Sequence, residues 1–242
     1  MPKKPNQRLI LSSFLILVAI PLTIAFGVVF LQDRKYYFIS AVVLIDTMLP
    51  FLLVFEHRKP KAREIILICS LSAIAVVGRI VFFMLPQFKP VTAVVIVSAV
   101  CLGPEAGFLV GAMSGFVSNF FFGQGPWTPW QMFGFGIIGF LAGVLFRKGM
   151  LKPQKAALCI FGGLATFFIY GGLMNFASVL MYSTAINREA LAATYLTGIP
   201  FDLIHASSTV IFLFFIEKPM SEKVARIRLK YGLINENEEL NS

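Results

Sequence analysis

Charged residues are scarce in this chain: Asp, Glu, Lys and Arg make up 14% of its 242 residues, whereas hydrophobic residues make up 57%. Soluble globular domains carry about 25% charged residues, so the composition excludes an ordinary soluble protein. The apolar residues also gather in runs long enough to cross a lipid bilayer as helices. The sequence therefore predicts an all-α polytopic membrane protein that lies in the lipid bilayer.

The chain also lacks the motifs of common catalytic and cofactor sites. It has no Gly-x-x-x-x-Gly-Lys-Ser/Thr loop, which would bind ATP phosphates, no His-Glu-x-x-His, no Cys-x-x-Cys and no Gly-x-Ser-x-Gly. The cysteines lie in apolar stretches without the spacing of metal ligands: Cys69, Cys101 and Cys159. We therefore expect no metal, no cofactor and no catalytic residues, which predicts that the protein is not an enzyme.

One glycine pattern does match a cofactor motif. Gly134-x-Gly136-x-x-Gly139 has the spacing of a dinucleotide-binding loop, but it lies inside an apolar run and follows no predicted strand. Small residues at such spacing let helices approach closely within a bilayer, as does Gly111-x-x-x-Gly115. We interpret both patterns as helix packing.

The apolar runs predict eight helical spans. Two N-terminal spans precede a basic loop and a six-helix core, which divides the chain into residues 1–63, a core at 64–217 and a polar tail at 218–242. At 12 residues, Val91–Leu102 is too short for a comfortable crossing. It is either a short helix inside the bundle or a re-entrant pair with the next span, because irregular backbone at that depth needs protein around it. The spans are Leu9–Leu31, Tyr37–Phe55, Ile65–Leu85, Val91–Leu102, Ala106–Phe122, Gln131–Phe146, Ala156–Tyr182 and Leu191–Ile216.

The basic residues predict the orientation of these spans. The net charge of +9 does not indicate nucleic acid, because the basic residues cluster in short loops between the spans and form no single face. Sixteen of the 21 Lys and Arg residues fall on one side, four on the other and Arg79 within a span. Such an excess marks the cytoplasmic side. We therefore expect a multi-pass protein of the cytoplasmic membrane with both termini in the cytoplasm.

One polar loop, residues 123–130, faces the opposite side of the membrane. It carries Trp127 and Trp130 between glycines and prolines. Thr128, Pro129 and Gln131 also predict a helix start, with Thr128 as the cap, Pro129 at the first position and Gln131 as the capping-box partner. The loop is therefore expected to have a fixed shape.

Ionisable residues within the spans are candidates for function, because charge is costly in a membrane. Arg79 and Asp202 are both expected near the outer side, where they either form an ion pair at a pocket floor or only lock two helices together. Asp202 and His205 share a helix face and can bond each other. Asp46, in the second span, is interpreted as a structural bond to a neighbouring helix.

Neutral polar and aromatic residues at a similar depth complete a candidate binding site. Together with Arg79, Asp202 and His205, they are expected to form a wet, aromatic-lined cavity for a solute. The alternative for the tryptophans is the aromatic belt at the membrane surface. These residues are Asn119, Trp127, Trp130, Gln131, Asn175 and Tyr182.

From about Glu64 to Ile216 the chain resembles the substrate-binding S components of energy-coupling factor (ECF) vitamin transporters. The resemblance rests on six helices with a short second one, on basic cytoplasmic ends, and on the stretch Gly-Gln-Gly-Pro-Trp-Thr-Pro-Trp-Gln-Met, which is similar to a cobalamin subgroup. It implies a vitamin ligand, a transmembrane coupling subunit and two ATPase subunits. It also implies a docking patch of small residues on the first core helix, for which Cys69 and Ala73 are the nearest match.

Two other classes compete with this interpretation. A proton- or ion-coupled secondary transporter could use Asp46, Arg79, Asp202 and His205 as a relay, but such folds often contain an internal repeat and the sequence shows none. A membrane-embedded enzyme requires a nucleophile and a base at one depth, and the sequence indicates no such pair.

Overall fold

A computed structural model describes residues 18, 22, 62–147, 149–183 and 187–232 of the chain. All regular elements in this described part are helical, and five of them are long and apolar enough to cross a membrane. The expected all-α polytopic membrane protein is thereby confirmed. Apart from residues 18 and 22, the two N-terminal spans, including Asp46, lie outside the described residues. The elements are α4 (Ala62–Val81), α5 (Val91–Leu102), α6 (Pro104–Phe122), α7 (Thr128–Ala142), η2 (Gly143–Arg147), α8 (Lys155–Leu164), η3 (Ala165–Gly171), α9 (Gly172–Tyr182) and α10 (Arg188–Lys230).

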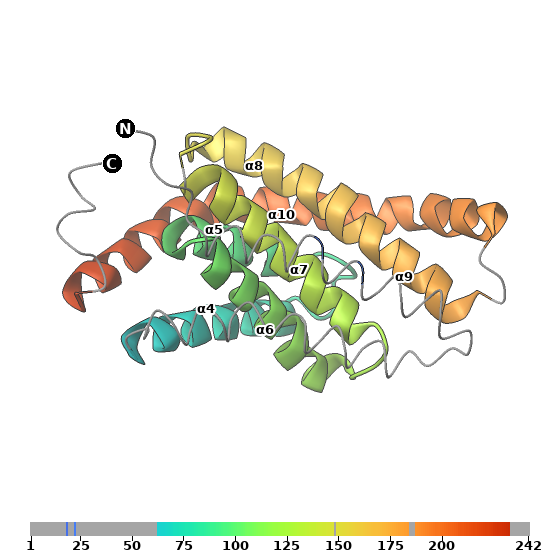
Figure 1. The fold of residues 1–242 in the computed structure, drawn as a ribbon, viewed down its shortest axis with the longest axis horizontal. Coiled ribbons are helices and arrows are strands. Elements are labelled where there is room, and N and C mark those ends of the chain that lie inside the picture. Colours follow the sequence, from blue (N-terminus) through green and yellow to red (C-terminus); the bar gives the residue numbers. More distant parts are fainter. Residues whose placement is uncertain (1–17, 19–21, 23–61, 148, 184–186, 233–242) are drawn as a thin grey trace.

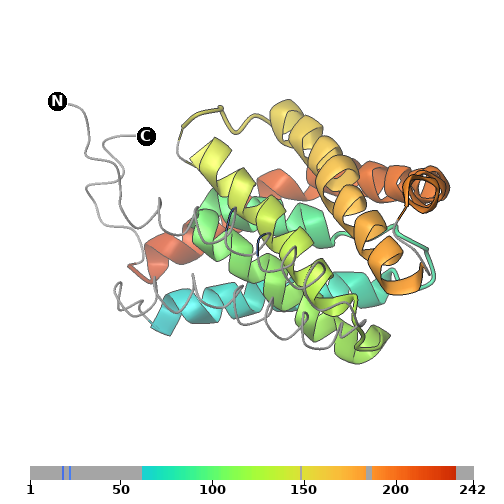
Figure 2. The ribbon, with the colours of Figure 1, turned by 45° about the vertical axis from the view of Figure 1, so that its right-hand side comes forward.

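These helices run in alternating directions through one bundle (Figure 1). We call the end that contains residues 82–90 and 123–127, the end of α9 and the start of α10 the loop end, on the right in Figure 1. The opposite end, with residues 62–63, 149–155 and 217–230, is the basic end. The helices α8, η3 and α9 form one continuous rod that packs along α10, which Figure 2 shows beside the group α4 to α7.

The short helix α5 lies inside the bundle and contacts α4, α6, α7 and α10. Its residues from Val91 to Ala99 are all buried, and 12 residues rise about 18 Å. It begins one turn below the end of α4, where Pro90 packs directly on Gly78. Gly103, with φ 113°, forms the single-residue connection to α6 at the basic end. The structure therefore matches the first alternative, an inner helix surrounded by protein.

Close packing of α6 on α7 confirms the interpretation of the glycine patterns. A Cβ atom on Gly111 would lie 2.5 Å from the backbone of Phe135, and one on Gly136 would lie 2.7 Å from the ring of Phe108. The backbones approach so closely only because side chains are missing there. No room for a nucleotide exists along this contact.

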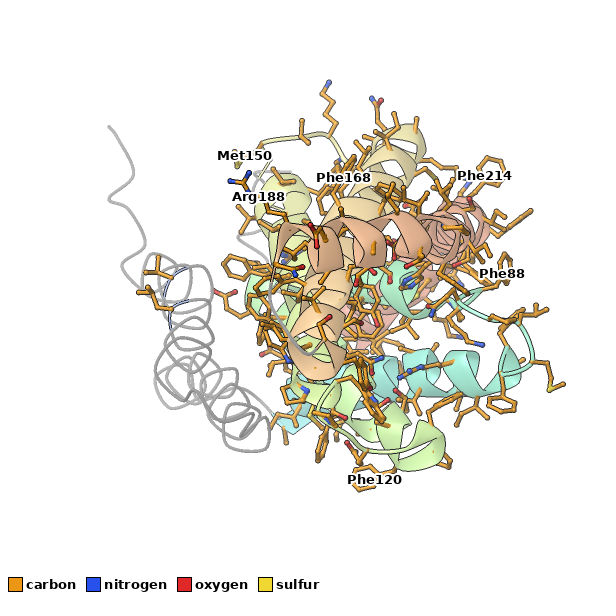
Figure 3. The ribbon with its side chains drawn as sticks, turned by 90° about the vertical axis from the view of Figure 1, so that its right-hand side faces the viewer. Phe88, Phe120, Met150, Phe168, Arg188 and Phe214 are labelled. Carbon is orange, nitrogen blue, oxygen red and sulfur yellow. The ribbon has the colours of Figure 1, made fainter. Side chains whose placement is uncertain are left out.

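The outer surface of the bundle is apolar. Phe120, Phe168 and Phe214 project outward on different sides in Figure 3, and each is more than half exposed. Lipid chains replace water around such side chains in a membrane. The surface therefore fits a protein embedded in a bilayer.

The last helix, α10, continues past the predicted membrane span, which ends at Ile216, to Lys230. Its polar part keeps an apolar face, on which Val224 is buried in the core. Arg228 donates a hydrogen bond of 2.9 Å to the carbonyl of Cys101 at the end of α5. The start of the tail is therefore helical, and the division of the chain at residue 217 stays a prediction.

Candidate functional site

A cavity of about 400 Å³ opens at the loop end of the bundle. Its wall is shared by the end of α4, the turn at residues 82–90, the start of α5, the end of α6, and the helices α7, η3, α9 and α10. Five of the sequence-predicted site residues line it: Arg79, Gln131, Asn175, Asp202 and His205. Elements distant in sequence thus bring these side chains to one place.

Arg79 is held by side chains of α6. Its Nη1 donates hydrogen bonds to Ser118 Oγ at 2.5 Å and to Asn119 Oδ1 at 3.0 Å, and its guanidinium lies 4.6 Å from the ring centre of Phe122. Buried Asn119 in turn donates to Gln131 Oε1 at 2.9 Å. This network fixes the arginine at the cavity wall and ties together α4, α6 and α7.

The expected ion pair between Arg79 and Asp202 does not form, because α6 already occupies the guanidinium. Asp202 Oδ2 instead accepts a hydrogen bond of 2.7 Å from Asn175 Nδ2. The expected bond between Asp202 and His205 is also wrong. His205 Nε2 lies 3.2 Å from Thr92 Oγ1, so the ring turns toward α5 in the interior. With separate partners, Asp202 and His205 form no relay in the described part of the chain.

Two stacked aromatic rings lie in the cavity wall, which Phe83, Phe122 and Phe201 also line. Phe135 and Tyr170 stack with their centres 4.5 Å apart and an angle of 26° between their planes. His205 lies edge-on to Tyr170 at 4.8 Å. Tyr170 is presented by the π-helix η3, a form often found at functional sites. Sequence reasoning missed both rings, because each lies within an uninterrupted apolar run.

Four predicted residues do not line the cavity. Trp130 is 4% exposed and packs edge-on against Phe176, while Trp127 lies against Gly125. Asn119 lies behind Arg79, and the side chain of Tyr182 is 66% exposed on the surface. The stacked rings of the wall come from α7 and η3, and the two tryptophans pack beside the loop, outside the cavity lining.

The loop is pinned, but not by the capping box expected from its sequence. α7 begins at Thr128, and no side-chain cap bonds to its first turn. Thr128 Oγ1 instead accepts hydrogen bonds from Gly125 N and Asn119 Nδ2 and donates one to Gln124 Oε1. Gln131 is unavailable as a capping partner, because its Oε1 accepts from Asn119.

Lys89 closes the turn beside the cavity. Its Nζ donates to the carbonyls of Phe82, Phe83 and Leu85, which follow the last turn of α4. Partial burial, with the nearby Arg79 guanidinium as a second cause, lowers the pKa of Lys89. The lysine charge therefore serves mainly to hold the turn.

The predicted docking residues lie on the outer face of α4. Cys69 and Ala73 are both exposed, and the larger exposed side chains of Ile66 and Val77 stand near them. The face is accessible to a membrane partner, and docking there stays a prediction.

A bundle of apolar helices with a cavity lined by rings and hydrogen-bonding groups defines a membrane protein that binds a small solute. Residues 59–221 match the family model described as "ECF-type riboflavin transporter, S component". The chain belongs to this family of transporter substrate-binding components, which is not an enzyme family.

Curated relatives also match part of the chain. A UPF0397 protein of Aliivibrio salmonicida is 30% identical over 62% of this chain and 80% of its own length. A UPF0397 protein of Vibrio atlanticus is 26% identical over 55% of this chain and 77% of its own length. No solved structure matches the chain significantly.

Proposed function

We propose that this protein is the substrate-capture subunit of an ECF importer and binds a vitamin at the outer face of the cytoplasmic membrane. The observation that carries the proposal is the cavity at the loop end, where the stacked rings of Phe135 and Tyr170 lie beside Arg79, Asn175 and Asp202. Rings offer broad apolar contact, and the polar groups fix the orientation of a solute. The excess of basic residues at the opposite end supports an outward-facing cavity.

The size of the cavity favours a flat vitamin of about the size of riboflavin. Its volume of about 400 Å³ lies toward the lower end of the roughly 300–1,000 Å³ typical of small-molecule sites. Intact cobalamin carries a macrocycle and a nucleotide loop and would need a much larger space. Riboflavin is therefore the first ligand to test, and cobalamin, which the sequence suggests, is the second.

Transport would use partner subunits. The chain has no phosphate-binding loop, so ATP hydrolysis falls to two ATPase subunits that act through a transmembrane coupling subunit. Docking through the small residues Cys69 and Ala73 of α4 would let the partner's helix approach closely. A nearly uncharged outer surface lowers the penalty for moving the protein within lipid during solute release.

Two measurements test the proposal. Purified protein in lipid nanodiscs should quench riboflavin fluorescence in a saturable manner and hydrolyse no ATP alone, and it should co-purify with the coupling and ATPase subunits when these are co-expressed. Failure to bind either riboflavin or cobalamin would refute vitamin capture. Ala73→Trp should reduce co-purification without changing binding, whereas the control Phe168→Trp, on another exposed face, should leave both unchanged.

A further inference from the structure

The paired side chains of Asn175 and Asp202 occupy a space kept open by two glycines. Gly171 on η3 lies beside Asp202, where a Cβ atom would fall 2.6 Å from the carboxylate carbon. Gly198 on α10 lies beside Asn175, where a Cβ atom would fall 2.7 Å from Nδ2. A glycine therefore faces each polar side chain of the pair, Gly171 opposite Asp202 and Gly198 opposite Asn175. The missing side chains leave room for both polar groups.

This pair has more capacity to accept hydrogen bonds than the protein uses. A carboxylate offers about four acceptor positions on two oxygens. Among the described residues, only Asn175 donates to Asp202, and it reaches a single oxygen, Oδ2. Asp202 is also the one carboxylate among the described residues that line the cavity. Leaving such a group without further donors is unfavourable at membrane depth.

The cations of the same cavity are already engaged. Arg79 donates to Ser118 and Asn119, and Lys89 donates to three backbone carbonyls of its turn. Neither makes an ion pair with Asp202 in the described part of the chain. At α9 and α10, by contrast, Asp202 keeps acceptor positions that no described residue is shown to fill.

We propose that the Asn175–Asp202 pair is the specificity-determining subsite, and that it accepts hydrogen bonds from N–H or O–H groups of the solute. It selects flat ring solutes that carry such donors and disfavours vitamins that carry a carboxylate, because that charge would face Asp202. This inference rests on the proposed function, since it concerns the same cavity. It adds the chemical class of solute that the cavity would select.

Riboflavin provides a probe with two kinds of donor, a ring N–H and side-chain hydroxyl groups. Titrations in nanodiscs should compare riboflavin with 3-methylriboflavin, which lacks the ring N–H, and with lumiflavin, which lacks the hydroxyl chain. At least one analogue should bind the wild-type protein about ten- to a hundredfold more weakly, as expected for hydrogen bonds to a charged group. Pantothenate, a vitamin with a carboxylate, should not compete.

The same titrations should then be repeated with Asp202→Asn. The affinity of the variant for riboflavin should fall by a similar factor. The difference in affinity between riboflavin and the weaker analogue should also shrink, because combining the protein variant with the ligand analogue, as in a double-mutant cycle, isolates the interaction between Asp202 and the missing donor. Glu189→Gln is the matched control, since Glu189 is an exposed carboxylate on the same helix outside the cavity. It should behave as wild type.

The outcomes separate this inference from the proposed function. Absence of binding to riboflavin and cobalamin would overturn both. Riboflavin binding with equal affinity for both analogues would overturn the subsite alone, and this result needs no variant. The subsite would also be overturned by an unchanged preference in Asp202→Asn or by competition from pantothenate.

Discussion

Asn119 offers the sharpest test of how the cavity wall is held. It is 1% exposed and takes part in three side-chain hydrogen bonds, to Arg79, Thr128 and Gln131. Asn119→Leu keeps a side chain of similar size and removes all three bonds. We expect the variant to fold with lower stability and to bind riboflavin more weakly, because Arg79 loses an acceptor that fixes its position.

The size of the effect follows from the bonds removed. Hydrogen bonds between membrane helices average about 0.6 kcal/mol each, so three contribute about 2 kcal/mol. The charged bond from Arg79 is worth more, about 1.5–3 kcal/mol, which raises the total to about 3–4 kcal/mol. At about 2–4 °C per kcal/mol for a chain of this size, Tm should fall by about 6–16 °C.

Thermal unfolding in detergent, followed by tryptophan fluorescence, measures this change. Tyr182→Phe is the control, because it removes a hydroxyl from an exposed side chain outside the cavity. A Tm within 1 °C of wild type for Asn119→Leu would refute the reasoning, since the network would then contribute nothing.

Three further predictions concern packing, the loop and the turn. Gly111→Ala should lower Tm, because its Cβ would fall 2.5 Å from the backbone of Phe135, whereas Gly172→Ala, with open space around it, should raise stability by about 0.5–1 kcal/mol. Equal Tm values for these two variants would contradict the close contact of α6 with α7. Trp130→Ala should destabilise by about 3–5 kcal/mol as a large buried ring is lost, and Trp127→Ala should leave riboflavin affinity unchanged. A loss of affinity in Trp127→Ala would place that ring at the ligand. Because the pKa of Lys89 is lowered in the folded protein, the unfolded chain keeps this proton to higher pH than the folded one does. The free energy of unfolding of the wild type should therefore rise slightly with pH toward 10.5, compared with that of Lys89→Met. Parallel pH profiles of unfolding would exclude this contribution.

The order and extent of the core helices could be predicted from hydropathy alone. A helix at Val91–Leu102 was expected from its apolar run, and the structure begins and ends α5 at those residues. Hydropathy did not give the end of α10 at Lys230, because Lys and Glu after Ile216 signal the end of a membrane span and not the end of a helix. Hydropathy therefore predicts which residues lie in the membrane better than it predicts where a helix ends.

Five of the nine predicted binding residues line the cavity, but the hydrogen-bond partners of the ionisable ones could not be predicted. Arg79, Asp202 and His205 stood out because charge inside a span is rare. The groups to which they bond depend on the rotation and the membrane depth of each helix, and neither can be read from the sequence. In the structure Arg79 bonds to Ser118 and Asn119 and not to Asp202, and His205 bonds to Thr92. Tyr170 was missed because a π-helix, which no sequence pattern announced, turns it toward the cavity.

The partners decide what the cavity can recognise. Had Arg79 paired with Asp202, the two charges would have neutralised each other and left an aromatic slot with little polar preference. Because α6 holds the arginine and Asn175 holds the carboxylate, donors and acceptors stay on separate walls. A ring solute that spans these walls can satisfy both, while the stacked pair of Phe135 and Tyr170 provides apolar contact. The selectivity that we propose therefore depends on keeping opposite charges apart at a depth where their attraction would be strong.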